Sequence, residues 1–348
     1  IELPRPAFGV SLHEEKNVIK TLRETEAAQR VFALIGGDVA LAQQETRVAV
    51  LGGLPFGQEG AATGQAAYLA DYVETLAQVV KMITPSARML FEPLASDSTV
   101  ASGYLTDREI VPSLETLIAA RPEVLLIAIG PLLSPKYAPL LERAVAQGTL
   151  VVLAAGNQTE QPSQQFVQPQ LVEEAMIVSA VTPAGSPVPY APTGTSLYWA
   201  PGEQIPVYNP DRQILEQRAG TGYAAAVAAG VAARVRAENP DLSLIEVLGV
   251  LRTTAVQQAT DPRIGVLNLQ NAVAKARSWE VMSGELFEES DRVDLMIPDG
   301  EPQGISRTIQ VDRQGRLFDV RVQVDIAHTY IGDLRVWLTS PQGQLFVL

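Results

Sequence analysis

The sequence predicts an α/β domain on a mostly parallel β-sheet, followed by a smaller all-β domain. Up to residue 283, short apolar runs alternate with helical patterns, which is typical of parallel strands joined by crossover helices. From residue 284 onward, apolar residues recur at every second position, which is typical of strands with one buried face. The 348 residues are 47% hydrophobic and 19% charged. A chain of this length and composition can bury a large core and a smaller one.

We expect residues 1–45 to form a helical extension. Apolar residues in Glu14–Ile35 have a loose helical spacing that ends at Gly36-Gly37, so we predict one helix packed on the outside of the sheet. His13 precedes this segment and is interpreted as a solvated residue near the helix start.

Residues 46–283 are expected to form the α/β domain, with five apolar runs as strands. These are Arg47–Leu51, Met89–Glu92, Val124–Ile129, Leu150–Ala154 and Met176–Val181. Helical patterns follow the first strand at Thr63–Ile83 and the next two at Arg108–Ala120 and Tyr137–Gln147. Gly148 ends the last of them, because glycine accepts the left-handed conformation common after a helix.

Residues 284–348 are expected to form the all-β domain. Apolar residues alternate with polar ones over Phe318–Ile326, and a second alternating run covers Leu334–Leu338. Only about four strands fit into this segment, whereas a two-sheet sandwich has seven or more. We therefore expect an incomplete β-domain, or one that needs partners.

Charge and composition exclude several function classes. The 26 basic and 39 acidic residues give a net charge of −13, which argues against nucleic acid as a partner. The chain has no cysteine, which excludes disulfides and thiolate chemistry. No run of 18 apolar residues occurs, so we expect no membrane span. A histidine base would have to be His13 or His328, because the sequence has no other histidine.

Two segments are specific enough to indicate a family. Leu150–Asn157 reads Leu-Val-Val-Leu-Ala-Ala-Gly-Asn, and Gly220–Gly230 begins Gly-Thr-Gly-Tyr-Ala. These resemble the subtilisin-like serine proteases, in which the first motif supplies the oxyanion-hole asparagine and Gly-Thr-Ser-Met-Ala carries the nucleophile at the start of a buried helix. The resemblance covers roughly Thr46–Ala276 and implies the three-layer fold of that family. Supporting segments are Tyr190–Gly194, Ala200–Ile205 and the capping-box sequence Ser243–Glu246.

The resemblance also implies that the catalytic triad is lost. Gly52 stands where the family has its aspartate, and Gly222 stands where it has its serine. The histidine position near Thr63 has no histidine, because none occurs between His13 and His328. These replacements favour an inactive homologue, a pseudoprotease that binds a peptide or protein or serves as a scaffold.

An alternative stays open: a serine-type endopeptidase with relocated catalytic groups. Its candidates are Thr221, Thr63, Glu59 and Asp97. A third hypothesis gives the domain a purely structural role. A relocated nucleophile would need both correct placement and a base.

The family's oxyanion-hole equivalent, Asn157, has two interpretations. Its amide and the start of the Gly222 helix form an acceptor pocket for a peptide carbonyl or C-terminal carboxylate. Alternatively, Asn157 caps its own turn.

The resemblance also implies a groove in which a peptide pairs as an extra strand. Its candidate residues are Ile129, Gly130, Ala154, Ala155 and Gly156.

The C-terminal segment resembles the P domain, or Homo B domain, of proprotein convertases. The matching stretches are Ile297–Gly300, Ile326–Val336 and Leu338–Gly343. This resemblance implies a jelly-roll-like sandwich that stabilises the protease domain, and it makes His328 a structural residue. It also makes calcium a candidate ligand of Asp299, Asp325 and Asp333. The location implied is secreted or at the cell surface, and a cytoplasmic location stays open.

Overall fold

The computed structural model describes most of the N-terminal four-fifths of the chain and short stretches beyond. The described residues are 12–40, 44–52, 65–91, 107–129, 137–157, 175–193, 197–209, 212–258, 261–279, 289–290, 295–297, 304–311, 322, 324, 326, 336–339 and 345–347. The chain divides into two compact units, Ile1–Arg292 and Val293–Leu348.

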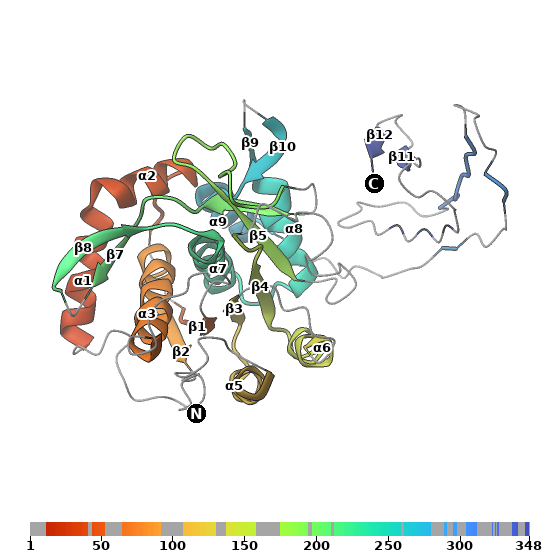
Figure 1. The fold of residues 1–348 in the computed structure, drawn as a ribbon. Coiled ribbons are helices and arrows are strands. Elements are labelled where there is room, and N and C mark those ends of the chain that lie inside the picture. Colours follow the sequence, from red (N-terminus) through yellow and green to blue (C-terminus); the bar gives the residue numbers. More distant parts are fainter. Residues whose placement is uncertain are drawn as a thin grey trace. The chain divides into compact units, whose positions relative to one another are not determined.

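The first unit is built on an eight-stranded sheet with strand order β2-β1-β3-β4-β5-β6-β10-β9 (Figure 1). All neighbouring strands are parallel except β10 and β9. The five predicted strands are confirmed as β1 to β5, with ends shifted by at most two residues. The strands are β1 Thr46–Gly52, β2 Ala87–Phe91, β3 Val124–Ala128, β4 Leu150–Ala154, β5 Met176–Val181, β6 Tyr198–Pro201, β9 Val256–Gln258 and β10 Asp261–Val266.

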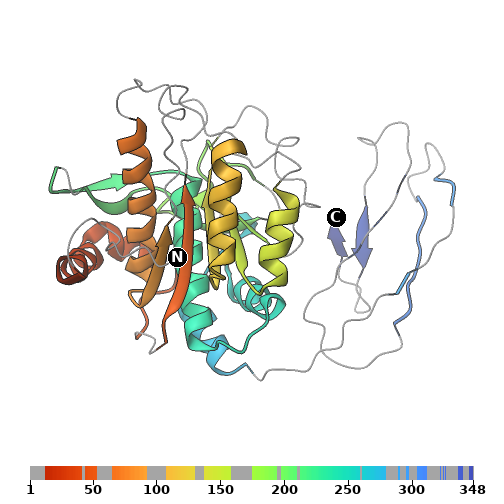
Figure 2. The same ribbon diagram turned by 90° about the horizontal axis from the view of Figure 1, so that it is seen from below.

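Helices cover both faces of this sheet, which confirms the predicted three-layer α/β fold. Figure 2 views the sheet from the side of α5 (Asp107–Ala119) and α6 (Ala138–Ala146), with α7 (Thr221–Glu238) beyond it. Alternate strand residues divide between the two faces, since successive side chains of a strand point in opposite directions. Ala49, Leu51, Leu125 and Ile127 pack with α5 and α6, whereas Val48, Val50, Val124 and Leu126 pack with α7 and α3 (Gln65–Ile83). Thr63, the predicted start of α3, lies outside the described residues.

Helix α7 is the buried centre of the unit. Nearly all of its residues are buried, and most are alanine, glycine or valine. At Gly230, a Cβ atom would lie 2.7 Å from the Cβ of Ile83 and 3.2 Å from the Val80 carbonyl oxygen, so glycine lets α7 and α3 approach closely. Two helices that follow α7 in the sequence, α8 (Leu244–Thr254) and α9 (Leu269–Arg277), pack against it.

The N-terminal segment forms two helices, α1 (Leu12–Glu24) and α2 (Glu26–Leu34), so the prediction of one continuous helix is wrong. Thr25 separates them, because its extended backbone ends the first helix and its hydroxyl caps the second by accepting from Ala28 N at 3.1 Å. His13 lies in the first turn of α1 rather than before it.

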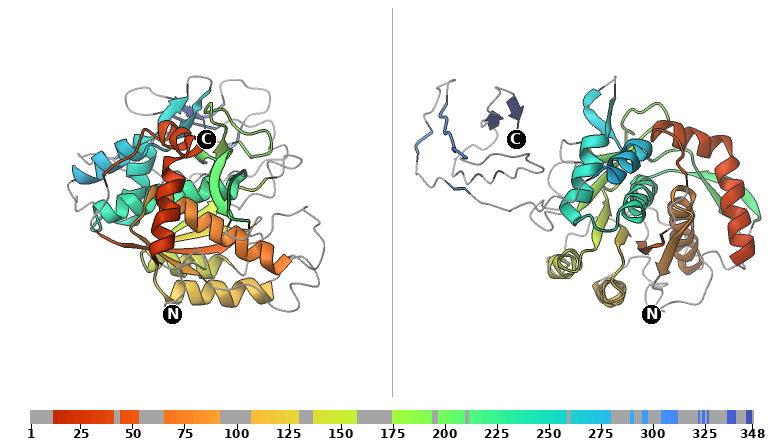
Figure 3. Two further views of the ribbon diagram at one scale, coloured as in Figure 1. Left: turned by 90° about the vertical axis from the view of Figure 1, so that its left-hand side faces the viewer. Right: turned by 180° about the vertical axis from the view of Figure 1, so that it is seen from behind.

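Helix α1 packs on α3 and on the hairpin of β7 (Ile205–Asn209) and β8 (Ile214–Arg218), as Figure 3 shows. A partly buried ion pair joins Lys81 of α3 to Glu15 of α1. The extension is thereby joined to the same helix that approaches the ends of β1 and β3.

In the second unit, β11 (Trp337–Thr339) pairs with β12 (Leu345–Val347) in an antiparallel ladder. Val322, Val324 and Ile326 of the predicted Phe318–Ile326 strand are not in a strand, and the residues between them lie outside the described part. Val322 is 40% exposed and Val324 50% exposed. These two side chains are therefore not buried, and the rest of the predicted Phe318–Ile326 strand lies outside the described residues.

Candidate functional site

The site begins where the strand order reverses. The chain passes from β1 to β2 on one side and returns to β3 on the other, and Gly52 at the end of β1 is the register partner of Ala128 at the end of β3. Ligand sites of open α/β sheets form outside the carboxyl ends of the strands at such a reversal. Asn157 follows the next strand, β4, three residues after its end.

The start of α7 faces this reversal point. Gly220 at the N-cap has φ of 140°, a left-handed conformation that favours glycine, and it offers no side chain for capping. The first N–H groups of a helix have no partner within the helix and need one elsewhere.

Asn157 supplies that partner. Its Oδ1 accepts from the backbone N of Thr221 at 2.9 Å and from the Thr221 hydroxyl at 3.0 Å. The same hydroxyl accepts from Gly156 N at 3.0 Å. Since a backbone N–H can only donate, the atom of the amide that faces Thr221 must be the oxygen. Asn157 therefore caps α7 from a distant loop. A cap within its own turn stays a prediction, because residues 158–174 lie outside the described residues.

Side chains of α3 occupy the space beside both Gly52 and Gly222. A Cβ atom placed on Gly222 would lie 1.9 Å from the hydroxyl oxygen of Tyr72, far inside van der Waals contact. A Cβ atom placed on Gly52 would lie 2.8 Å from Val73 Cγ2 and 3.4 Å from both Tyr72 Cδ1 and Leu76 Cδ1. The positions that the sequence analysis assigned to the serine and the aspartate thus border on one helix surface.

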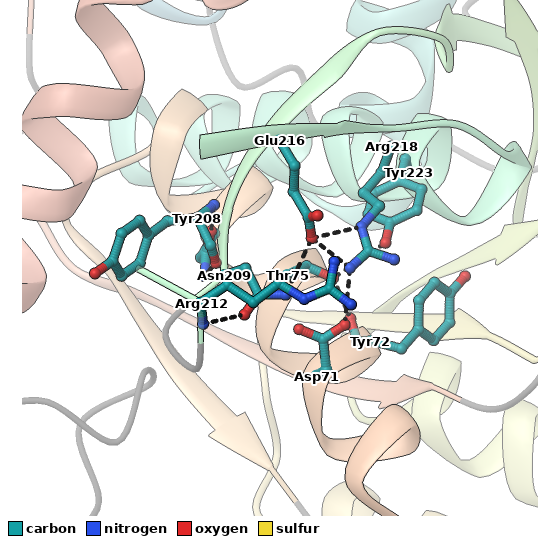
Figure 4. Close-up of polar contacts among 10 residues, drawn as sticks. Asp71, Tyr72, Thr75, Tyr208, Asn209, Arg212, Glu216, Arg218 and Tyr223 are labelled. Carbon is teal, nitrogen blue, oxygen red and sulfur yellow. Dashed lines mark hydrogen bonds and ion pairs between the residues drawn. The ribbon is translucent and has the colours of Figure 1, made fainter. Parts of the chain in front are cut away.

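A polar network fastens α3 to the hairpin next to this point (Figure 4). Arg218 of β8 donates to Asp71 Oδ2 at 3.0 Å and to Glu216 Oε1 at 2.5 Å. Burial alone lowers the pKa of Arg218, but Tyr223, Glu216 and Asp71 outweigh burial and raise it, so the guanidinium stays charged.

A second set of contacts continues the network along α3. The Thr75 hydroxyl donates to the Tyr72 carbonyl at 2.9 Å, so the Tyr223 hydroxyl, 3.1 Å away, donates to Thr75. Sequence reasoning missed Tyr72 and this network. The sequence offered one signal for it. Two glycines at the ends of a strand and a helix leave space, and a close-packed interior requires a large side chain to fill that space.

The family relationship follows from comparison with known proteins. A family model described as "Subtilase family" matches residues 63–275. This chain belongs to the subtilase family. A second model, described as "Proprotein convertase P-domain", matches residues 317–348 of this subtilase. Both resemblances stated from the sequence are confirmed.

Solved structures show the same fold for this subtilase at low sequence identity. The self-cleaved protease domain of PatA is 20% identical, with a TM-score of 0.54 over 67% of this chain and 96% of that chain. The nisin leader peptidase NisP from Lactococcus lactis is 10% identical, with a TM-score of 0.57 over 71% of this chain and 93% of that chain.

The predicted peptide groove of the subtilase is only partly described. Ile129 follows β3, Ala154 ends the adjacent strand β4, and Ala155 and Gly156 follow it, while Gly130 lies outside the described residues. Ala155 N donates to Val178 O at 2.9 Å, and Gly156 N donates to Thr221 Oγ1 at 3.0 Å. These two N–H groups are therefore engaged within the fold.

The predicted Tyr190–Gly194 loop of the subtilase begins with a half-buried phenol, and Gly194 lies outside the described residues. Burial, and to a lesser extent Glu203, raises the pKa of Tyr190 to about 12. Tyr190 is therefore protonated at neutral pH and unsuited to act as a base.

The metal expectation for this subtilase stays a prediction. Asp299, Asp325 and Asp333 lie outside the described residues, as does His328. Within the described ranges, no cluster of three or more histidine, aspartate or glutamate side chains is arranged to hold a metal ion. Among the helices of the described residues, none is both long and apolar enough to cross a membrane.

Proposed function

We propose that this subtilase is a catalytically inactive homologue whose domain serves as a scaffold or binds a peptide or protein. The observation that carries this proposal is the pair of glycines at the triad positions. Gly222 and Gly52 have no side chain to act as nucleophile or carboxylate, and the sequence has no histidine between His13 and His328.

The size of the loss supports inactivity. A serine hydroxyl attacks only when a base accepts its proton and a third group orients that base. In subtilisin, the type member of the family, removal of the triad lowers kcat about 10⁶-fold. Asn157, the oxyanion-hole equivalent, would by itself supply only the much smaller rate enhancement that such enzymes keep after the triad is removed.

The alternative of a relocated nucleophile finds little support at Thr221. Its hydroxyl proton points to the Asn157 amide oxygen, and its lone pair accepts from Gly156 N. Neither partner is a base, so nothing activates this hydroxyl for attack. The other candidates, Thr63, Glu59 and Asp97, lie outside the described residues.

Two features support the scaffold role ahead of peptide binding. The phenol of Tyr72 lies where a side chain at position 222 would begin. The Ala155 and Gly156 N–H groups are already engaged, so a peptide strand gains fewer hydrogen bonds there.

Hydrolysis of labelled casein and labelling by a fluorophosphonate test the proposal. The full chain, assayed with and without calcium beside a triad-intact subtilase, is expected to give no hydrolysis above the buffer blank and no labelled band. Thr221→Val and Thr221→Ser serve as a matched pair. Hydrolysis or labelling that Thr221→Ser keeps and Thr221→Val loses would establish a relocated nucleophile and overturn the proposal.

A further inference from the structure

Three small residues from three elements leave a notch at the reversal point of the sheet. They are Gly52 at the end of β1, Ala128 at the end of β3 and Gly222 in the first turn of α7. Gly52 and Ala128 are register partners, and Ala128 Cβ lies 3.4 Å from the Cβ position of Gly222. The ring of Tyr72 fills this notch, with its hydroxyl toward Gly222 and its edge toward Gly52.

The ring is held from the side by a second aromatic residue. Tyr223 and Tyr72 make an edge-to-face contact, with centroids 5.6 Å apart and planes at 85°. The Tyr72 side chain therefore has aromatic, glycine and alanine surfaces around it, which suit a phenol ring in shape and chemistry.

One face of α3 is fastened to the hairpin and to α7 next to this ring (Figure 4). Asp71 forms an ion pair with Arg218 of β8, and the hydroxyl of Thr75 is hydrogen-bonded to the hydroxyl of Tyr223 of α7. Gln78 exchanges two hydrogen bonds with the backbone of Tyr208, at 2.7 and 2.8 Å. Residues 71, 75 and 78 lie on one helix face because they are spaced by four and three positions.

We propose that Tyr72 is a built-in plug, an intramolecular occupant that closes the former nucleophile position while α3 stays fastened to the hairpin. The plug excludes a peptide from the first turn of α7, and its withdrawal leaves a site that accepts a phenol ring. The proposal rests on the proposed function, because only an inactive site tolerates a ring at this place.

Rescue by a small phenol tests the plug. Tyr72→Ala removes the ring, and p-cresol has the ring and hydroxyl that were lost. Apolar cavities left by such truncations bind aromatic molecules. At a p-cresol concentration about ten times its Kd, the Tm of Tyr72→Ala is expected to rise by about 3 °C, since ligand binding to the folded state stabilises it.

The wild type and Tyr208→Ala are the matched controls. Tyr208→Ala also removes a half-buried phenol near α3, but from the β7 surface that packs on Ile19 and Leu22. Neither control is expected to gain stability from p-cresol. No rise for Tyr72→Ala, or an equal rise in all three proteins, overturns the proposal.

A second variant covers the case in which Tyr72→Ala does not fold. Tyr72→Leu keeps an apolar side chain but no longer reaches Gly222, so amide hydrogens of residues 221–224 are expected to exchange about tenfold faster than in the wild type. Unchanged exchange there would overturn the plug. Casein hydrolysis decides the proposed function separately, because the plug is measured by stability and exchange alone.

Discussion

Replacing Gly222 by alanine adds one methyl group where the Tyr72 hydroxyl lies. The added Cβ would be 1.9 Å from that oxygen. Ordinary contact begins near 3.4 Å, so the phenol must withdraw by about 1.5 Å. Overpacking of this kind costs about 1–3 kcal/mol. We expect the upper half of this range, because Tyr223 holds the ring and Arg218 holds the helix that carries it.

Alanine also has a better helix propensity than glycine, by at most about 1 kcal/mol. The net destabilisation expected for Gly222→Ala is therefore about 1–2 kcal/mol, or a Tm lower by about 2–8 °C for a domain of this size. Urea unfolding followed by circular dichroism measures it, with an unchanged m-value as the sign that the native state stays compact.

Gly249→Ala is the matched control, since it makes the same substitution inside α8. A Cβ atom at Gly249 would have no atom within 4 Å. Only the propensity gain remains there, so this variant is expected to be more stable than the wild type by up to about 1 kcal/mol.

A double-mutant cycle isolates the contact with the ring. In the Tyr72→Ala background, Gly222→Ala meets no phenol and should become neutral or stabilising, which gives a coupling free energy of about 2 kcal/mol. If Gly222→Ala instead behaves like Gly249→Ala, or costs the same with and without Tyr72, the reasoning about the filled position is refuted.

Substitutions at three further positions test other contacts. Gly230→Ala should destabilise the fold by about 1–3 kcal/mol in urea unfolding, because the α3 carbonyl beside it cannot move aside, and equal stability would contradict the close helix packing. Asn157→Ala should cost about 1–2 kcal/mol in the same assay by leaving Thr221 N without its acceptor, whereas Asn157→Asp keeps the oxygen and should cost less. Burial alone raises the pKa of Glu123, but hydrogen bonds and charge of Arg47 outweigh it and lower the pKa. A lowered pKa stabilises the fold above the unfolded value near 4.3, and that effect is lost as the pH falls through the folded value. Glu123→Gln should therefore cost under about 1 kcal/mol at pH 7, and progressively less as the pH falls below the unfolded value. A cost that persists at low pH would contradict the charge pairing.

Much of the α/β fold could be predicted because its signals are local. Runs such as Val124–Ala128 are buried on both faces and read as continuous apolar stretches, and glycine marks the helix ends. The break at Thr25 was missed, since its hydroxyl acts as a cap only when the chain turns there, and threonine also occurs inside helices.

By itself, the sequence determined that glycine stands at the two positions that the family resemblance assigns to aspartate and serine. Glycine at 52 and 222 and the lack of a histidine between them are matters of composition and order. Only the tertiary structure decided what lies in their place. Tyr72 is 20 residues from Gly52 and 150 from Gly222 along the chain, and the notch it fills exists only where β1, β3 and α7 meet. From the sequence, Asn157 likewise looks like an ordinary loop residue. Its hydrogen bond to the start of α7 joins two residues that are 64 positions apart in the sequence. Such contacts arise from packing between distant segments, which local propensity does not encode.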